Sequence, residues 1–393
     1  MIFRLLILCN AFDDQTRIER GVSTDSPAGS RKVFLLAKAL RKGGVRAWVL
    51  SLGRGRAGGR ASFFRGVVRR IDGVPVIYAP FSTVPLLSEL ISLLALVPVV
   101  FRLNRRGMNG ALFYNRMLAY LPALLLCSFL GFKRFLDLED GEVVSSGGVV
   151  RRFGLRVLRR VFDALCSDGA LLACSALKSW TSVRPTFCYY GTAIGDASPH
   201  RFSSDRLTVL MGGALWPETG ADLLADAIER MRAAAPSWAD PLQFEVTGQG
   251  SGLERFRILE RSAGAPYVRV HGRTTDAEYR EILARCDIGL ALKLNAGSLA
   301  HTTFPSKVVE YAAAGMLVMT TDISDVRSVL GEQGAVFLTK DDPDLLCTLF
   351  REAIQEREQC RALALNGMSR VRELCDPAMA GVALGRFMFS GEA

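Results

Sequence analysis

Short apolar segments of strand length alternate with amphipathic segments of helix length along most of this 393-residue chain. In the first half, residues 3–9 have the pattern of a buried strand, 31–44 have helical periodicity, and 45–52 have the pattern of a second strand. The second half repeats this alternation, with strands over 207–213, 242–250, 267–272, 288–292 and 316–322 and helices over 221–231, 276–286 and 305–315. Strands separated by single helices predict an α/β fold with parallel sheets, in which ligands bind at the carboxyl ends of the strands.

The chain is longer than chains that usually fold around one hydrophobic core, so we predict two domains. The segment 191–205 is rich in Gly, Ser, Pro and Asp and is the expected connection between them. We therefore expect an N-terminal domain over 1–195, a C-terminal domain over 196–375 and a terminal segment over 376–393.

The net charge of +10 is unevenly distributed. Residues 1–200 contain 28 Lys and Arg against 13 Asp and Glu, a net charge of +15, whereas residues 201–393 contain 21 against 26, a net charge of −5. A basic first half favours an anionic partner there, either nucleic acid or a membrane surface. The segment 54–60 (RGRAGGR) is similar to RNA-binding tracts, but it is short and isolated. We therefore expect no nucleic-acid partner.

Two apolar runs, 84–101 and 117–132, are interrupted by polar residues or prolines. Both fall short of the roughly 20 apolar residues that span a bilayer. A buried helix is the favoured interpretation, an interfacial helix the second, and a membrane span the third. Arginines that interleave with Phe63 and Phe64 or follow the first run support the interfacial alternative, although a solvated basic loop explains them equally well. These arginines are Arg54, Arg56, Arg60, Arg65, Arg69, Arg70, Arg102, Arg105 and Arg106.

Cysteine usage and the first residues both favour a cytoplasmic protein. The nine cysteines include no C-x-x-C pair and lie mostly in apolar surroundings, which is typical of reduced, buried thiols. The apolar run within residues 1–10 is too short for the core of a signal peptide, and we expect it to form the first strand.

The stretch HTTFPSKVVEYAAAG (301–315) combines a helix start suited to an anion with one internal carboxylate. Pro305 fits the first helical turn, where free N–H groups and the helix dipole favour a phosphate. Ser306, Lys307 and Glu310 fall on one face of this helix, and the Glu310 carboxylate can accept hydrogen bonds from the vicinal hydroxyls of a ribose. The opposite side is apolar and is expected to face the core: Val308, Val309, Ala312 and Ala313. The residues fit a surface ion pair between Lys307 and Glu310 equally well.

The residues FPSKVVEYAAAG (304–315) resemble the signature of the nucleotide-sugar-dependent glycosyltransferases of family 4, which are retaining enzymes of the GT-B fold. Other stretches resemble this family in order along nearly the whole chain: 26–44, 211–228, 246–250, 268–273 and 285–292. The resemblance implies two facing Rossmann-like domains with parallel sheets and a cleft between them. Residues 1–195 would bind the acceptor, 196–375 would bind a nucleoside-diphosphate sugar, and 376–393 would form a helix that crosses back to the N-terminal domain.

On the donor side, the resemblance assigns Glu310 to the ribose. The family's usual Arg and Lys of the donor turn are replaced by Ala214 and Thr219, so Lys307 and Lys293 are the expected substitutes. Lys307 would then act in catalysis by stabilising the charge of the leaving diphosphate. The other implied donor contacts lie at the helix start, in the preceding loop, in the donor turn and beside the nucleobase. They are Pro305, Ser306, Ser298, Thr302, Thr303, Gly213, Gly272 and Arg273, with Thr302 standing where the family often has a second acid.

On the acceptor side, the resemblance places Gly29 and Ser30 where the backbone approaches an acceptor or a phosphate. Asn115 occupies a position where the family often has a sugar-contacting histidine. The segment 135–142 (FLDLEDGE) ends a predicted strand with a group of acids. Glu139 and Asp140 are expected there to bind sugar hydroxyls or to act as the acceptor base, and a solvated turn explains them equally well.

The resemblance implies a retaining glycosyltransferase that moves a sugar from a nucleoside-diphosphate sugar to an acceptor glycan or lipid-linked saccharide in the biosynthesis of cell-surface polysaccharide, such as a lipopolysaccharide precursor. No cofactor and no metal are expected, because the three histidines lack metal-ligand spacing. The expected location is the cytoplasm, with peripheral attachment to the anionic inner face of the plasma membrane. Two alternatives stay open: a GT-B nucleotide-sugar epimerase and a catalytically silent GT-B-like binding subunit.

Overall fold

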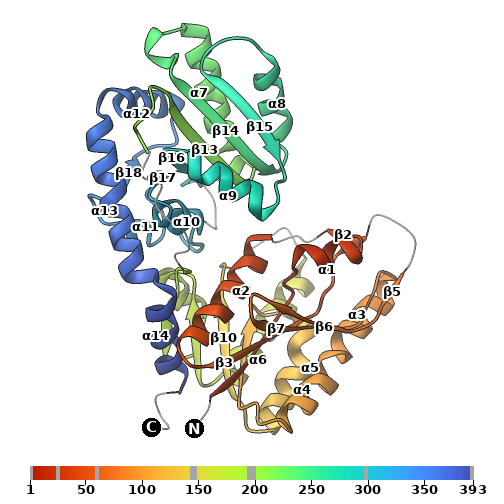
Figure 1. Cartoon of the computed structure of the whole chain (residues 1–393). Helices are drawn as coiled ribbons and strands as arrows, with labels where there is room; N and C mark the ends of the chain where they lie inside the picture. The colour runs from red at the N-terminus through yellow and green to blue at the C-terminus, as the bar shows by residue number, and fades with distance from the viewer. Residues whose placement is uncertain are drawn as a thin grey trace. The chain divides into compact units, whose positions relative to one another are not determined.

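The computed structural model describes residues 3–23, 27–57, 62–141, 148–192, 201–295 and 300–389. The chain forms two compact units, one of Met1–Thr192 with Pro377–Ala393 and the other of Ala193–Asp376. Each unit contains a sheet with helices packed against it (Figure 1).

The sheet of the first unit has the strand order β12-β11-β10-β9-β1-β3-β7-β6. Neighbouring strands are parallel except for the antiparallel pair β6 and β7. The strands are β1 (Arg4–Cys9), β3 (Arg46–Ser51), β6 (Val67–Ile71), β7 (Val74–Tyr78), β9 (Gly110–Tyr114), β10 (Lys133–Leu138), β11 (Gly169–Leu172) and β12 (Thr186–Cys188). The strand order reverses between β1 and β9, and such a point is where open parallel sheets bind ligands.

Helices and short elements complete the first unit. The helices are α1 (Asp14–Glu19), α2 (Pro27–Lys42), α3 (Pro85–Leu94), α4 (Leu96–Asn104), α5 (Leu121–Phe129), α6 (Val149–Leu165) and α14 (Pro377–Phe389). The short elements are β2 (Val22–Ser23), β4 (Arg56–Ala57), β5 (Phe63–Phe64), β8 (Phe81–Ser82) and the 3₁₀ turns η1 (Leu118–Tyr120) and η2 (Ser175–Trp180). Residues of α2, β1, β3 and β7 share one buried core with residues of α14.

Helices α2 and α14 cross at unusually close range. A methyl group on Gly381 would lie 1.9 Å from the carbonyl oxygen of Ala39, and one on Gly43 would lie 2.2 Å from the backbone of Gly381. Real Cβ atoms do not approach other atoms so closely, so both positions require glycine. The terminal helix is therefore packed into the first unit by a backbone-to-backbone contact.

The apolar run 84–101 forms α3 and α4. Only 22% of the window Leu87–Asn104 is buried, so the favoured interpretation of this run as a buried helix is wrong. Leu96, Val100 and Leu103 do pack into the unit, whereas Leu90, Leu94 and Phe101 are exposed. The two helices therefore pack one apolar side into the unit and expose the other to solvent.

The sheet of the second unit is wholly parallel, with the order β15-β14-β13-β16-β17-β18. Its strands are β13 (Leu207–Ala214), β14 (Leu242–Gln249), β15 (Tyr267–Gly272), β16 (Ile288–Ala291), β17 (Leu317–Thr321) and β18 (Val336–Leu338). This is the strand order of a doubly wound Rossmann fold, with its switch point between β13 and β16. The predicted α/β class with parallel sheets is confirmed.

The connections of the second sheet are mostly helical. They are α7 (Ala221–Ala234), α8 (Leu253–Arg261), α9 (Asp276–Arg285), α10 (Lys307–Ala313), α11 (Val326–Leu330), α12 (Pro343–Gln355), α13 (Arg357–Cys375), η3 (Pro217–Thr219) and η4 (Ser237–Ala239). Helix α10 begins at Lys307 with Ser306 as its N-cap, two residues later than the start expected at Pro305. Its apolar side is buried as predicted, with Val308 and Ala312 both 0% exposed.

Arg201 is the first described residue of the second unit, and its guanidinium is buried. It donates hydrogen bonds to the carbonyl oxygens of Leu283 at 3.0 Å, Ala314 at 2.7 Å and Cys286. These carbonyls lie at the C-terminal ends of α9 and α10. One side chain therefore satisfies the last carbonyls of both helices.

Glu245 on β14 is fully buried. It accepts a hydrogen bond from Arg285 at 2.9 Å and lies in contact with the imidazole of His271. Burial alone raises the pKa of Glu245, but the hydrogen bonds from Arg285 and His271 outweigh it, so the pKa lies below its usual value. The carboxylate is therefore held in its charged form inside the second unit.

All nine cysteines are free thiols, and seven of them are buried. Burial raises the pKa of Cys9 to about 12, so this thiol stays protonated at neutral pH. The expectation of buried thiols is confirmed for these seven residues.

Candidate functional site

The turn after β13 lies at the switch point of the second sheet. Gly213 has a φ of +111°, which favours glycine, and a methyl group there would lie 3.4 Å from Cε of Lys307. A methyl group on Gly212 would lie 3.0 Å from the hydroxyls of both Thr247 and Tyr311. The two glycines therefore leave the backbone of the turn open beside a lysine and hydroxyl groups.

Lys307 is held among two tyrosines and one carboxylate. Its Nζ lies 2.7 Å from the hydroxyl of Tyr279 and 2.7 Å from Oε2 of Glu310. The same ammonium lies 4.4 Å from the ring centroid of Tyr279 and 5.8 Å from that of Tyr311. Aromatic faces stabilise a cation at these distances. The cluster joins α9, which carries Tyr279, to α10, which carries the other three residues.

The pair of Lys307 and Glu310 is not the exposed surface pair that the sequence left open. The side chains are 27% and 13% exposed, respectively. Tyr279 also donates to Glu310 Oε2 at 3.3 Å, so lysine and tyrosine share one carboxylate oxygen. Burial raises the pKa of Tyr311, which keeps its hydroxyl protonated. The cluster offers one cation and neutral hydroxyl donors beside the glycine turn.

The loop before α10 is attached to the neighbouring strand ends. Lys293 donates from Nζ to the hydroxyl of buried Thr303, and the hydroxyl of Thr321 donates to the carbonyl of Lys293 at 2.5 Å. Thr302 is half-buried and Ser306 is exposed, and the Ser306 side chain does not cap the helix. Ser298 lies outside the described residues. Lys293 therefore connects this loop to the strand ends, and its contact with a diphosphate stays a prediction.

The two positions where the donor turn departs from the family pattern, Ala214 and Thr219, follow Gly213 in the sequence. Ala214 is exposed. The hydroxyl of Thr219 donates to the carbonyl of Ala214 at 2.6 Å and accepts from the amide of Trp216 at 3.0 Å. Thr219 therefore closes the turn, and neither position supplies a cation. Lys307 is the cation that the structure places against Gly213.

Gly272 is the last residue of β15, two strands from β13 in the same sheet, and Arg273 follows it. Gly272 is buried with a φ of +62°, and Arg273 is exposed. The chain thus turns sharply at the carboxyl edge of the sheet. Their assignment to the nucleobase stays a prediction.

A second polar cluster lies at the carboxyl end of β10 in the first unit. Lys32 of α2 lies with Nζ 3.3 Å from Oδ1 of Asp137 and pairs with Glu139. The same Nζ lies 5.4 Å from the ring centroid of Tyr189. Burial lowers the pKa of Lys32 and raises the pKa of Asp137. Carboxylates beside an aromatic ring are groups that can bind a polyhydroxyl molecule.

The other predicted acceptor residues have structural partners. Asn115 has a φ of +59°, and its Oδ1 accepts from the amide of Glu139 at 3.0 Å, so it braces the end of β10. The hydroxyl of Ser30 accepts from the amide of Phe12 at 3.0 Å. Gly29 is buried in the first turn of α2, and Asp140 is exposed. Their contacts with an acceptor stay predictions.

Sequence reasoning missed Tyr279, Lys32 and Asp137. Tyr279 and Lys32 lie within helical patterns, where a tyrosine fits the core and a lysine fits the solvated face. Asp137 lies inside a predicted strand and was overlooked in favour of the acids that follow it. Within the described residues, no group of three or more His, Cys, Asp or Glu is arranged to hold a metal ion.

Residues 206–356 match the family model described as "Glycosyl transferases group 1". Among curated proteins, the phosphatidylinositol N-acetylglucosaminyltransferase gpi3 subunit of Schizosaccharomyces pombe is 24% identical over 72% of this chain and 62% of its own length. An Arabidopsis thaliana subunit with the same enzyme name is 23% identical over 82% of this chain and 70% of its own length. The GPI3 subunit of Saccharomyces cerevisiae (strain YJM789) is 24% identical over 36% of this chain and 29% of its own length. The chain thus spans less than two thirds of the length of the two yeast relatives.

Solved structures share the fold along nearly the whole chain. HepE from Anabaena, solved in complex with UDP and glucose, is 15% identical and covers 99% of this chain and 100% of its own, with a TM-score of 0.64. Sucrose-phosphate synthase from Thermosynechococcus elongatus has the same coverage at 14% identity and a TM-score of 0.69. WaaG, a glycosyltransferase involved in lipopolysaccharide biosynthesis, has the same coverage at 13% identity and a TM-score of 0.62. The fold expected from the sequence, that of GT-B enzymes, is confirmed.

Proposed function

We propose that this chain, a glycosyltransferase of the GT-B fold whose residues 206–356 match the group 1 glycosyl transferases, moves a sugar from a nucleoside-diphosphate sugar to a hydroxyl group of its acceptor. Transfer proceeds with retention of the anomeric configuration, as the resemblance of residues 304–315 to the family 4 signature implies. The acceptor hydroxyl arrives on the face from which the diphosphate leaves, and a leaving-group oxygen assists its deprotonation.

The observation that carries this proposal is the cluster of Lys307, Glu310 and Tyr279 beside the open turn at Gly213. In this proposal Glu310 binds the ribose hydroxyls and Lys307 binds the diphosphate. The diphosphate gains negative charge as the glycosidic bond breaks, so a fixed cation stabilises the transition state more than the ground state. Lys307 thereby takes over the role of the cations missing at positions 214 and 219.

The nucleotide proposed first is UDP, since HepE, which shares the fold, was solved with UDP and glucose. The acceptor is a glycan or a lipid-linked polyhydroxyl group that meets Glu139, beside Lys32, at the carboxyl end of β10. The Glu139 carboxylate accepts hydrogen bonds from acceptor hydroxyls, and the nearby ring of Tyr189 packs on the apolar face of the acceptor. Two kinds of similar protein support this class: the curated relatives are phosphatidylinositol N-acetylglucosaminyltransferase subunits, and WaaG is involved in lipopolysaccharide biosynthesis.

Calorimetric titration of the full chain with UDP, GDP and dTDP tests the nucleotide, and a panel of sugar nucleotides assayed for slow donor hydrolysis tests the sugar. We expect Glu310→Ala to weaken nucleotide binding and Lys307→Ala to slow hydrolysis by about 100-fold or more, since loss of one preorganised transition-state donor costs about 2.7–4 kcal/mol. Unchanged nucleotide affinity in Glu310→Ala would refute the assignment of the ribose.

The same measurements separate the rival functions. Failure of all three nucleotides to bind would favour a catalytically silent binding subunit. Conversion of a sugar nucleotide into its epimer without an acceptor would favour an epimerase. We also propose a cytoplasmic reaction without a metal or other cofactor, and hydrolysis that disappears in a chelator would contradict this.

A further inference from the structure

The outer side of α3 and α4 is a continuous apolar stripe. Leu87, Leu90, Leu94 and Phe101 are 43%, 54%, 58% and 43% exposed, and their spacing places them on one side of the two consecutive helices. By length and composition, Leu87–Asn104 is the one candidate membrane span among the described residues. Its inner side, including Leu96 and Val100, is buried in the unit. A span would have to remove these residues from the core, so the stripe is suited to lie on a surface.

A second stripe lies on the neighbouring helix. Leu118, Leu125 and Phe129 are 58%, 52% and 88% exposed, again at helical spacing. Helix α5 packs against both α3 and α4, and Figure 1 shows the three helices side by side in the first unit. Because each helix turns its buried side to the core, the exposed stripes share the outer side of this layer. We call these seven residues, Leu87, Leu90, Leu94, Phe101, Leu118, Leu125 and Phe129, the apolar face.

Helix α6 packs against α5 and adds positive charge. Along its length this helix exposes Arg151, Arg152, Arg156 and Arg160 together with Phe153, which is 67% exposed. Asp163 is the only acid in this helix, and it is neutralised by Arg116 at 2.8 Å. The helix therefore carries a strong net positive charge on its exposed side, which we call the basic side of α6.

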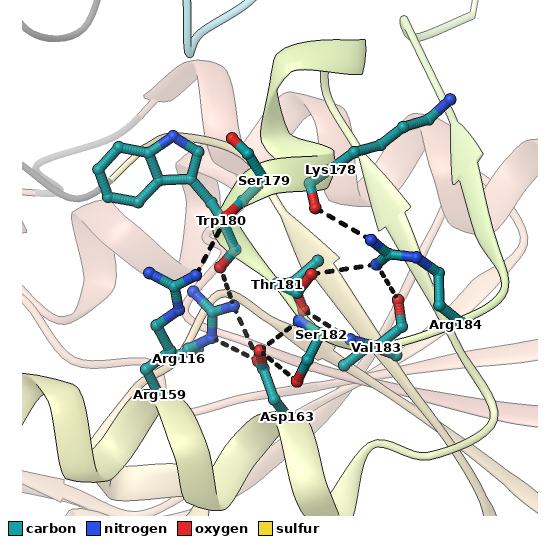
Figure 2. A network of polar contacts seen from close by, with 10 residues as sticks. All are labelled: Arg116, Arg159, Asp163, Lys178, Ser179, Trp180, Thr181, Ser182, Val183 and Arg184. Atoms are coloured by element: carbon teal, nitrogen blue, oxygen red, sulfur yellow. Dashed lines mark hydrogen bonds and ion pairs between the residues drawn. The ribbon is translucent and has the colours of Figure 1, made fainter.

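The C-terminal end of α6 is fixed by a polar network (Figure 2). Asp163 accepts from Arg116 and from the amide of Ser182 at 2.8 Å, and Arg116 also donates to the carbonyl of Trp180 at 2.9 Å. Arg159 donates to the carbonyl of Ser179 at 3.3 Å. The C-terminal end of the helix is thus anchored to the unit, while its basic side faces solvent.

Further arginines lie at the end of the first stripe. Arg102 and Arg105 are exposed in the last turn of α4 and just after it, and the guanidinium of Arg105 lies 4.7 Å from the ring centroid of Phe101. Glu89 is the one acid within α3, α4 and α5. Amphipathic helices with aromatic and leucine residues beside arginines are typical of the interface of an anionic bilayer.

We propose that the apolar face and the basic side of α6 together dock the first unit on the surface of an anionic phospholipid bilayer. The seven apolar side chains enter the boundary between headgroups and acyl chains, and the arginines pair with lipid phosphates. Charge complementarity selects this occupant, because a second copy of the chain would bring the same arginines against one another. Docking goes beyond the transfer reaction and does not depend on it. It places the protein at the membrane as a peripheral protein.

Sedimentation of the 393-residue chain with phosphatidylcholine vesicles, with and without an anionic phospholipid, tests the proposal. We expect binding only with the anionic lipid, and release as the salt rises well above about 0.15 M, because screening weakens contacts with lipid phosphates. Leu125→Ser with Phe129→Ser should lower the partition coefficient at least about tenfold, equivalent to about 1.4 kcal/mol. The matched control is Ile258→Ser with Leu365→Ser, which changes apolar residues of the second unit that are 54% and 50% exposed.

The charge component has its own pair of variants. Arg156→Gln with Arg160→Gln should weaken binding and flatten its salt dependence, whereas Arg351→Gln with Arg361→Gln, at exposed positions of α12 and α13, should not. Melting temperatures confirm that each variant is folded. Equal binding to neutral vesicles, equal losses in the control variants, or no vesicle binding by the unaltered protein would overturn the proposal. Self-association that only the apolar-face variants abolish, without vesicle binding, would assign the face to a second copy instead.

Discussion

Tyr279 holds the ammonium of Lys307 by its hydroxyl and by its ring, and Tyr279→Phe removes only the hydroxyl. The variant keeps the ring 4.4 Å from Nζ but loses the 2.7 Å hydrogen bond and the weaker 3.3 Å bond to Glu310. A hydrogen bond to a charged group contributes about 1.5–3 kcal/mol. Lys307 is 27% exposed, so water replaces part of this loss and the lower end of the range applies. We expect about a tenfold loss of UDP affinity.

Calorimetric titration of the full chain with UDP measures this effect. Tyr267→Phe is the matched control. Tyr267 is 57% exposed and lies at the first residue of β15, whereas the proposed nucleotide site lies at the carboxyl ends of the strands. Tyr279→Ala, which also removes the ring, should cost more than Tyr279→Phe. The reasoning is refuted if Tyr279→Phe binds UDP as the unaltered protein does, or if Tyr267→Phe loses as much affinity. If the unaltered protein does not bind UDP at all, the proposed donor is wrong and the role of Tyr279 is tested with the nucleotide that does bind.

Three further predictions concern stability. Gly381→Ala should force α2 and α14 apart and lower the free energy of unfolding by about 1–3 kcal/mol, which lowers Tm by about 2–12 °C. Gly385→Ala on the same helix meets only a side-chain methyl 3.3 Å away and should cost less. Equal melting temperatures of the two variants would contradict the close crossing. The depressed pKa of Glu245 means that its stabilising contribution is present above about pH 4.5 and is lost as the pH falls through the folded-state pKa, so urea titrations of Glu245→Gln should show a flatter acid dependence than the unaltered protein. Lys32→Met should destabilise the first unit by about 3–5 kcal/mol, because it leaves Asp137 buried without its cation. Adding Asp137→Asn should recover part of that loss. If the effects of the two substitutions are additive in the double variant, the two residues do not act as a pair.

The alternation of strands and helices was sufficient to predict the α/β class, because period-two and period-3.6 patterns are local properties of the chain. The strand order of the second sheet was not predicted, because the right-handed crossover rule fixes the hand of each connection but not the point at which the order reverses. The burial of the apolar run 84–101 was predicted wrongly. Its composition fits both a core and a surface, and only the packed structure shows which side of the helices the unit covers.

The candidate donor site was predicted in part. Lys307 and Glu310 carry a recognisable spacing within one helix, so the sequence pointed to both. Tyr279 comes from another helix 28 residues earlier in the chain, and no local pattern distinguishes a tyrosine that contacts a lysine from one that fills a core. The contact between Lys32 and Asp137 was missed for the same reason, because 105 residues separate them in the chain.

The guanidinium of Arg201 has a consequence for how this protein tolerates change. It closes the C-terminal ends of α9 and α10, the two helices that bring Tyr279 to Lys307 and Glu310. Arg201 thus fixes the spacing of the two helices at their C-terminal ends, whereas Tyr279 and Lys307 lie near their N-terminal ends. A lysine at position 201 has one amine in place of the planar three-nitrogen guanidinium and cannot reach the carbonyls of both helices at once, so even this conservative substitution should loosen the cluster.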